Sequence, residues 1–136
     1  MFMPCISFQG NCNEALEFYQ QAIGAQLKSI HRFGPDAPAD FKATITLPDD
    51  FVMNSELIID GQPVMMTDGG AETPKSGHFS MTLLKDTEEQ AHQTFNALAQ
   101  GGTIVQNMKP VFWASIYGVV QDKFGLEWQV MTGAPE

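Results

Sequence analysis

The sequence contains the same order of elements twice, and this internal repeat is the feature that most restricts its fold. Each copy reads as a strand, a helix and then three strands; the first spans about residues 1–70 and the second about residues 77–133. A unit of roughly 60 residues buries too little surface to be more than marginally stable alone, so the two copies must share a core or a sheet. The sequence therefore predicts the α+β class, with paired βαβββ modules in one domain of 136 residues.

Each copy has one segment with apolar residues at helical spacing. The first helix is predicted at 11–24, with Asn11 or Asn13 as N-cap and Gly24 as its stop. Its inward face would carry Ala15, Leu16, Tyr19, Ala22 and Ile23. The second helix is predicted at 86–102, starting at Asp86 or Thr87 and stopping at Gly101-Gly102. Its inward face would carry Ala91, Phe95 and Leu98.

The remaining apolar runs are predicted as strands, and their turns align the two copies. The first copy has strand material at 5–9, 25–33, 42–47, 52–60 and 62–68, with a loop at 34–40. The second copy has strands at 78–84, 103–113, 115–125 and 126–131. The Asp60-Gly61 pair predicts a hairpin turn. When the two copies are aligned at the Gly61 and Gly125 turns, Met65 corresponds to Gln129.

Charge and composition exclude several classes of partner. Sixteen acidic residues against seven basic ones give a net charge of −9, and no cluster of Lys or Arg offsets it. Such a chain repels phosphate backbones and anionic lipid, so we expect neither a nucleic acid nor a membrane as partner. No apolar run approaches the ~20 residues of a membrane span. No secretory signal is readable, so we expect a cytoplasmic protein. Cys5 and Cys12 are expected to be free thiols.

Several motifs in combination resemble one family. They are "ISFQGNCNEALEFY", "PVMMTD" and "FWASIYGVVQDKFG", followed by the late tryptophan. With them the chain resembles the PhnB-like branch of the vicinal oxygen chelate superfamily, which includes glyoxalase I, bleomycin-resistance proteins and extradiol dioxygenases. Members of the branch are often labelled 3-demethylubiquinone-9 3-methyltransferase-like. The resemblance implies a curved mixed sheet around a cleft, and a homodimer.

The resemblance also implies a divalent metal, held by one side chain from the first strand and one from the last strand of each unit. In the second unit these positions are His78 and Gln129; in the first they are Pro4 and either Met65 or Met66. A Zn, Ni, Mn or Fe(II) site needs about three N or O donors, and neither Pro nor Met supplies one. We therefore expect no tightly bound metal, and at most a weak divalent site at His78 and Gln129.

The residues near the end of the chain favour a ligand pocket. In 126–131, alternation places Trp128 on one face of the strand and Gln129 on the other. If the helices cover the Trp128 face, Gln129 points into the cleft, where an amide can orient a small ligand. The amide could equally bond a neighbouring backbone group, and both tryptophans could fill core. The predicted ligand-binding residues are Phe8, Met65, Met66, Trp113, Tyr117 and Gln129.

Three hypotheses for the function follow. The first is a protein that binds a neutral or cationic small organic molecule in a hydrophobic cleft. The second is a metal-dependent lyase, isomerase or dioxygenase that uses His78, Gln129 and Asp68. The third is a structural or regulatory dimer whose own side chains fill the cleft. Methyl transfer is not expected, because Pro74 interrupts "TDGGAETP", where a Gly-rich loop for S-adenosylmethionine would have to start a helix.

Overall fold

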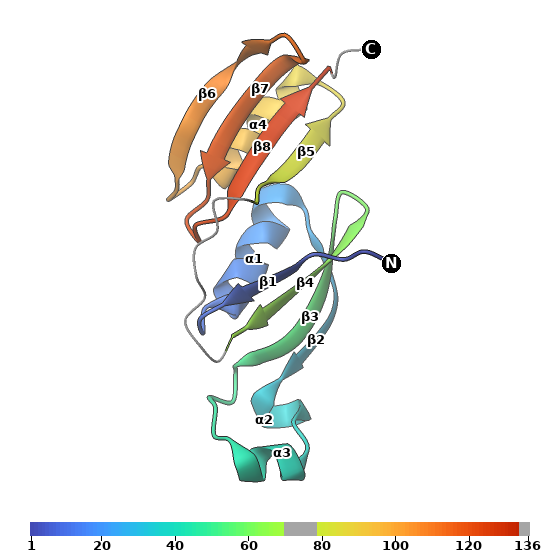
Figure 1. Ribbon diagram of the computed structural model, residues 1–136, viewed down its shortest axis with the longest axis vertical. Helices are drawn as coiled ribbons and strands as arrows, with labels where there is room; N and C mark the ends of the chain where they lie inside the picture. Colours follow the sequence, from blue (N-terminus) through green and yellow to red (C-terminus); the bar gives the residue numbers. More distant parts are fainter. Residues whose placement is uncertain (70–78, 134–136) are drawn as a thin grey trace. The chain divides into compact units, whose positions relative to one another are not determined.

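The computed structural model describes residues 1–69 and 79–133. The chain divides into two compact units, Met1–Pro74 (unit 1) and Lys75–Glu136 (unit 2), which are described separately below. Each unit contains one four-stranded mixed sheet with a longer helix packed on one of its faces (Figure 1). No helix within the described ranges is long and apolar enough to cross a membrane.

Unit 1 follows the predicted order of strand, helix and three strands, with two short helices inserted. Its elements are β1 (Cys5–Phe8), α1 (Cys12–Ile23), β2 (Gln26–Arg32), α2 (Phe33–Asp36), α3 (Ala39–Thr44), β3 (Val52–Ile59) and β4 (Gln62–Asp68). The strands lie in the order β1-β4-β3-β2, with β1 parallel to β4 and the other pairs antiparallel.

Unit 2 repeats this topology. Its elements are β5 (Met81–Lys85), α4 (Glu88–Leu98), β6 (Thr103–Val111), β7 (Ala114–Gln121) and β8 (Glu127–Thr132). The strand order is β5-β8-β7-β6, again with one parallel pair, between the first and the last strand of the unit. The predicted pairing of two βαβββ modules is confirmed.

The predicted helix faces and stops are largely confirmed. Helix α1 buries Ala15, Leu16 and Tyr19 and ends at Gly24, whose φ of 67° is left-handed, whereas Ala22 and Ile23 are only half-buried. Helix α4 buries Ala91, Phe95 and Leu98, and Thr87 caps it by accepting a hydrogen bond from the Gln90 amide.

The strand predicted at 42–47 is wrong. Lys42, Ala43 and Thr44 lie in α3, where the Lys42 amide donates to the Pro38 carbonyl (3.0 Å) and the Thr44 hydroxyl to the Phe41 carbonyl (2.8 Å). Strand β2 pairs directly with β3, so this segment does not lie between them in the sheet. The loop predicted at 34–40 likewise contains most of α2. Local backbone hydrogen bonds therefore outweighed the β-branched side chains that suggested a strand.

The turns used for the repeat alignment behave as predicted. Asp60 and Gly61 both have positive φ, 49° and 80°, and join Ile59 to Gln62 in a two-residue hairpin. The order of burial then matches between the last strands of the two units: Val64, Met66 and Asp68 are buried in β4, as Trp128, Val130 and Thr132 are in β8. The predicted correspondence of Met65 with Gln129 agrees with this alternation.

The two thiols differ in their exposure to solvent. Cys5 is exposed, whereas burial, aided by the negative charge of Asp68, raises the pKa of the Cys12 thiol to about 12. The ordinary thiol pKa of 9.0 returns on unfolding, so the folded state should lose stability as pH rises from 9 toward 12. At pH 8 the Cys12 thiol therefore stays protonated and is a poor nucleophile. We expect iodoacetamide at pH 8 to alkylate Cys5 in the native protein and Cys12 only after urea is added, as read by mass spectrometry of peptides. Rapid native alkylation of Cys12 would contradict this assignment.

Candidate functional site

The sheet of unit 2 has one face covered by α4 and one face free of it. A side chain at Gly118 would point at Phe95 of α4, since an added Cβ would lie 2.8 Å from the Phe95 ring. Gly118 pairs with Val130, so Val130 and Trp128 share the α4 face, in agreement with their burial. The neighbouring positions Tyr117 and Gln129 therefore lie on the opposite face.

A chain of hydrogen bonds runs across this opposite face. The Tyr117 hydroxyl donates to Gln129 Oε1 (2.9 Å), and Gln129 Nε2 donates to the Ser80 hydroxyl oxygen (2.7 Å). Burial, with a smaller contribution from the negative charge of Glu127, raises the pKa of the Tyr117 hydroxyl, so Tyr117 stays protonated and able to donate. The amide of Gln129 is thus fixed at both ends.

Apolar side chains surround this chain. Tyr117 and Val119 are buried, and Trp113 and Met131 pack against them. The rings of Trp113 and Tyr117 pack edge to face, with 5.1 Å between their centroids. The exposed Phe112 ring packs edge to face on Trp113, with 4.6 Å between the centroids. We call the six residues Ser80, Trp113, Tyr117, Val119, Gln129 and Met131 the Tyr117 surface. It offers apolar contact around a few fixed polar atoms, which is the chemistry of a small-molecule site.

The sequence analysis missed three members of this surface, Val119, Met131 and Ser80, and Ser80 is the polar one among them. It lies just before β5, inside the segment predicted as a strand at 78–84. The family resemblance implies that the first and last strands of a unit lie near each other, but only the register, in which Thr82 pairs with Gln129, brings Ser80 to the amide.

The two tryptophans have different roles. Trp128 is 1% exposed, and its indole Nε1 donates to Asp122 Oδ2 (2.9 Å). The other oxygen of Asp122 accepts from the amides of Phe124 (2.9 Å) and Leu126 (3.1 Å), which fixes the turn between β7 and β8. Trp128 therefore belongs to the core, and Trp113 to the Tyr117 surface.

In unit 1 the predicted site residues are divided between the two faces of the sheet. Asp68 accepts from the Cys12 amide of α1, so its side chain is on the α1 face. Met66 shares that face by alternation, as does Phe8, which pairs with Asp68; both are buried. Phe8 and Met66, expected to line a cleft, thus lie in the core, while Met65 is half-buried on the other face.

The described residues do not fit the divalent metal site that the family resemblance implies. Pro4 and Met65 supply no N or O side-chain donor, and both ends of the Gln129 amide are engaged. Asp68, the possible additional ligand, accepts three backbone N–H bonds instead. Within residues 1–69 and 79–133, no group of three His, Cys, Asp or Glu side chains could hold a metal ion.

His78 lies outside the described residues, so its predicted role as a metal ligand stays a prediction. The strand pairing of the two units shows which residue of unit 2 corresponds to Pro4. Cys5 pairs with Met65, and Thr82 pairs with Gln129, so the residue of unit 2 that corresponds to Pro4 is Met81. His78 precedes that position by three residues.

Comparison with known proteins gives a consistent relationship over nearly the whole chain. The family model described as 3-demethylubiquinone-9 3-methyltransferase matches residues 1–131. Protein YjdN of Escherichia coli (strain K12) is 31% identical over 135 residues, which cover 93% of this chain and 91% of YjdN. The crystal structure of PA1353 from Pseudomonas aeruginosa has a TM-score of 0.81 at 32% identity and covers 98% of this chain and 97% of its own.

More distant structures share the fold. A putative 3-demethylubiquinone-9 3-methyltransferase, PhnB protein, from Bacillus cereus has a TM-score of 0.80 at 23% identity and covers 97% of this chain and 98% of its own. The fosfomycin resistance protein FosX from Listeria monocytogenes has a TM-score of 0.68 at 12% identity, covering 98% and 93%. These likenesses confirm the predicted fold class.

Proposed function

Because the chain belongs to the PhnB-like family described as 3-demethylubiquinone-9 3-methyltransferase, within the vicinal oxygen chelate superfamily, we propose that it binds a small organic molecule on the Tyr117 surface of unit 2. The observation that carries this proposal is the Tyr117–Gln129–Ser80 chain on the sheet face opposite α4. A core does not need a half-buried amide held at both ends, whereas a ligand site gains orientation from one.

The directions of these hydrogen bonds indicate which polar groups of a ligand each side chain could bind. Ser80 accepts from Gln129, so its own O–H proton is available to an acceptor on the ligand. Tyr117 donates to Gln129, so its oxygen can accept from a donor on the ligand. The rings of Trp113 and Phe112 provide the apolar contact area for an aromatic or aliphatic part.

The charge near the surface favours a neutral or cationic molecule. The carboxylate of Glu127 acts on Tyr117 strongly enough to contribute to its raised pKa. Lys109 pairs with Tyr117 in the β6–β7 ladder, but its side chain is exposed to water, which screens it. With a net charge of −9, the protein also repels anions at long range.

Methyl transfer, which the family description names, is not part of this proposal. The family description alone does not fix an activity. Sites for S-adenosylmethionine usually use a Gly-rich strand–helix loop in a parallel sheet, and each sheet described here has a single parallel pair. The homodimer also remains a prediction.

A fragment screen tests the proposal. Neutral and cationic aromatic fragments are screened against the full chain by saturation-transfer NMR, and the hits are repeated with Gln129→Met and Tyr117→Phe. Gln129→Met installs the residue that unit 1 carries at the corresponding position, so it should preserve packing. Tyr117→Phe removes one hydrogen bond of the ligand-orienting chain and Gln129→Met removes both, so we expect affinity to fall roughly tenfold for Tyr117→Phe and at least as much for Gln129→Met.

The matched control is Gln121→Met, the same substitution at the exposed end of β7. It should leave binding unchanged. Absence of any hit, or hits that bind Gln129→Met as well as they bind the unchanged protein, would refute the assignment of the ligand site to the Tyr117 surface.

A further inference from the structure

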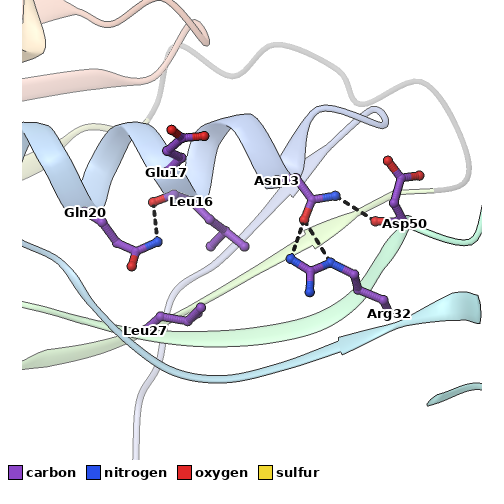
Figure 2. Close-up of a pocket in the computed structure, with 7 residues that line it drawn as sticks. All are labelled: Asn13, Leu16, Glu17, Gln20, Leu27, Arg32 and Asp50. Atoms are coloured by element: carbon purple, nitrogen blue, oxygen red, sulfur yellow. Dashed lines mark hydrogen bonds between the residues drawn. The ribbon is translucent and has the colours of Figure 1, made fainter. Parts of the chain in front are cut away.

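Unit 1 contains a separate pocket between α1 and β2, shown in Figure 2. Its volume is about 450 Å³, within the usual range for small-molecule sites. It is lined by Asn13, Leu16, Glu17, Gln20, Leu27, Arg32 and Asp50. All seven residues belong to unit 1, so the pocket is complete without the Tyr117 surface.

Arg32, the only arginine in the sequence, is fixed in this pocket. Its Nε and Nη2 atoms both donate to the side-chain oxygen of Asn13, at 3.1 and 2.8 Å. Asn13 is held in turn, because its Nδ2 donates to the backbone carbonyl of Asp50 (2.7 Å) (Figure 2). The half-buried guanidinium is therefore positioned before any ligand arrives.

The arrangement leaves one edge of the guanidinium without a protein partner. Within the part of the chain that the structure describes, the Arg32 side chain donates to Asn13 alone. Asp36, the nearby acid, accepts from the Arg32 backbone amide. The edge formed by Nη1 and Nη2 remains, and its two parallel N–H groups match a carboxylate. Since Asn13 is neutral, the positive charge of Arg32 is not cancelled by its partner.

The other walls of the pocket restrict what can accompany the carboxylate. Leu16, which is 3% exposed, and Leu27, which is 37% exposed, form an apolar wall between helix and strand. The amide of Gln20 is bonded to the Leu16 carbonyl (3.0 Å). The exposed carboxylates of Glu17 and Asp50 also line the pocket; they weaken the binding of any anion, and they oppose a doubly charged anion more strongly than a singly charged one.

We propose that this pocket binds a small aliphatic monocarboxylate, with its carboxylate on the Nη1–Nη2 edge of Arg32 and its chain on Leu16 and Leu27. The site is distinct from the Tyr117 surface in both residues and ligand charge. It also explains why the chain places its one arginine beside a neutral amide that holds it open.

The test is an NMR titration of the full ¹⁵N-labelled chain that follows the Nε–Hε signal of Arg32. The probes are butyrate, hexanoate, succinate and the uncharged butyramide. Butyrate and hexanoate should shift the Arg32 signal to saturation, with hexanoate binding more tightly because it covers more of the leucine wall. Succinate and butyramide should bind at least about tenfold more weakly.

Variants separate recognition from general charge. Arg32→Lys keeps the charge but loses the planar fork, and should weaken butyrate binding roughly tenfold. Because this variant lacks the arginine Nε–Hε group, its titration is followed on the backbone amide signal of Leu27. Lys42→Gln removes another cation of unit 1 outside the pocket and should change nothing, as should Gln129→Met. If neither monocarboxylate moves the Arg32 signal, or if butyramide moves it equally, Arg32 is only a clamp between β2 and α1 and the proposal is wrong. The signal of the unchanged protein decides this even if Arg32→Lys fails to fold.

Discussion

Replacing Asp122 by alanine should lower the free energy of unfolding by about 3–5 kcal/mol. The carboxylate is 3% exposed and accepts hydrogen bonds from the Trp128 indole and from the amides of Phe124 and Leu126. Alanine supplies no acceptor, so three donors that are paired in the folded state lose their partner. Each such donor costs about 1–3 kcal/mol when it is buried, and water can reach the turn amides more easily than the indole.

Urea unfolding followed by tryptophan fluorescence measures this change. The Nε1–H signal of Trp128 in NMR should also move, because its acceptor is removed. Asp86→Ala, at an exposed position of the same unit, is the control and should cost less than about 1 kcal/mol. Asp122→Asn should fall between the two, since it keeps one oxygen but turns an NH₂ group toward the turn or the indole. A loss below about 1 kcal/mol for Asp122→Ala would contradict the role assigned to the carboxylate.

The positions of most strands were predictable because they follow from short-range periodicity; the run at 42–47, which forms part of α3, was the exception. Alternation in 126–131 separated Trp128 from Gln129, and the structure places them on opposite faces. The Asp60-Gly61 pair predicted its hairpin because both residues must accept positive φ, which few pairs do. These predictions need only the chemistry of neighbouring residues.

The parts that depended on register or on distant pairs were not predictable. Ser80 meets Gln129 across 49 positions, and Arg32 meets Asn13 across 19. A shift of one residue in a strand would move each side chain to the other face, and nothing local fixes that register. The same limit explains Phe8 and Met66, which alternation alone could have put on either face.

Asp68 illustrates this limit most clearly, since the sequence suggested a metal ligand and the structure shows a buried connector. Its Oδ1 accepts from the amides of Gly10 (2.8 Å) and Cys12 (2.9 Å), and its Oδ2 from the amide of Val52 (2.9 Å). One side chain at the end of β4 thus ties together the start of α1 and the start of β3. Asn11, the predicted cap, makes no side-chain bond to the helix, because Asp68 performs that function.

Asp68→Asn should therefore destabilise the protein by about 2–4 kcal/mol. Asparagine can keep the two bonds made by Oδ1, but its NH₂ group would then face the Val52 amide, donor against donor. The substitution also removes the negative charge that helps to raise the pKa of the Cys12 thiol, while burial continues to raise it. Loosening the first turn of α1 should expose that thiol more often.

Two measurements on one variant check this account. Urea unfolding gives the loss of stability, and the rate of Cys12 alkylation in the absence of urea reports opening at the start of α1, which should rise at least about tenfold because 1.4 kcal/mol already changes an equilibrium tenfold. Asp40→Asn, at an exposed position of α3, is the matched control and should change neither quantity. If stability falls but Cys12 stays protected, Asp68 supports β3 rather than the helix. If both are unchanged, the three hydrogen bonds do not stabilise the fold and the connector role is refuted.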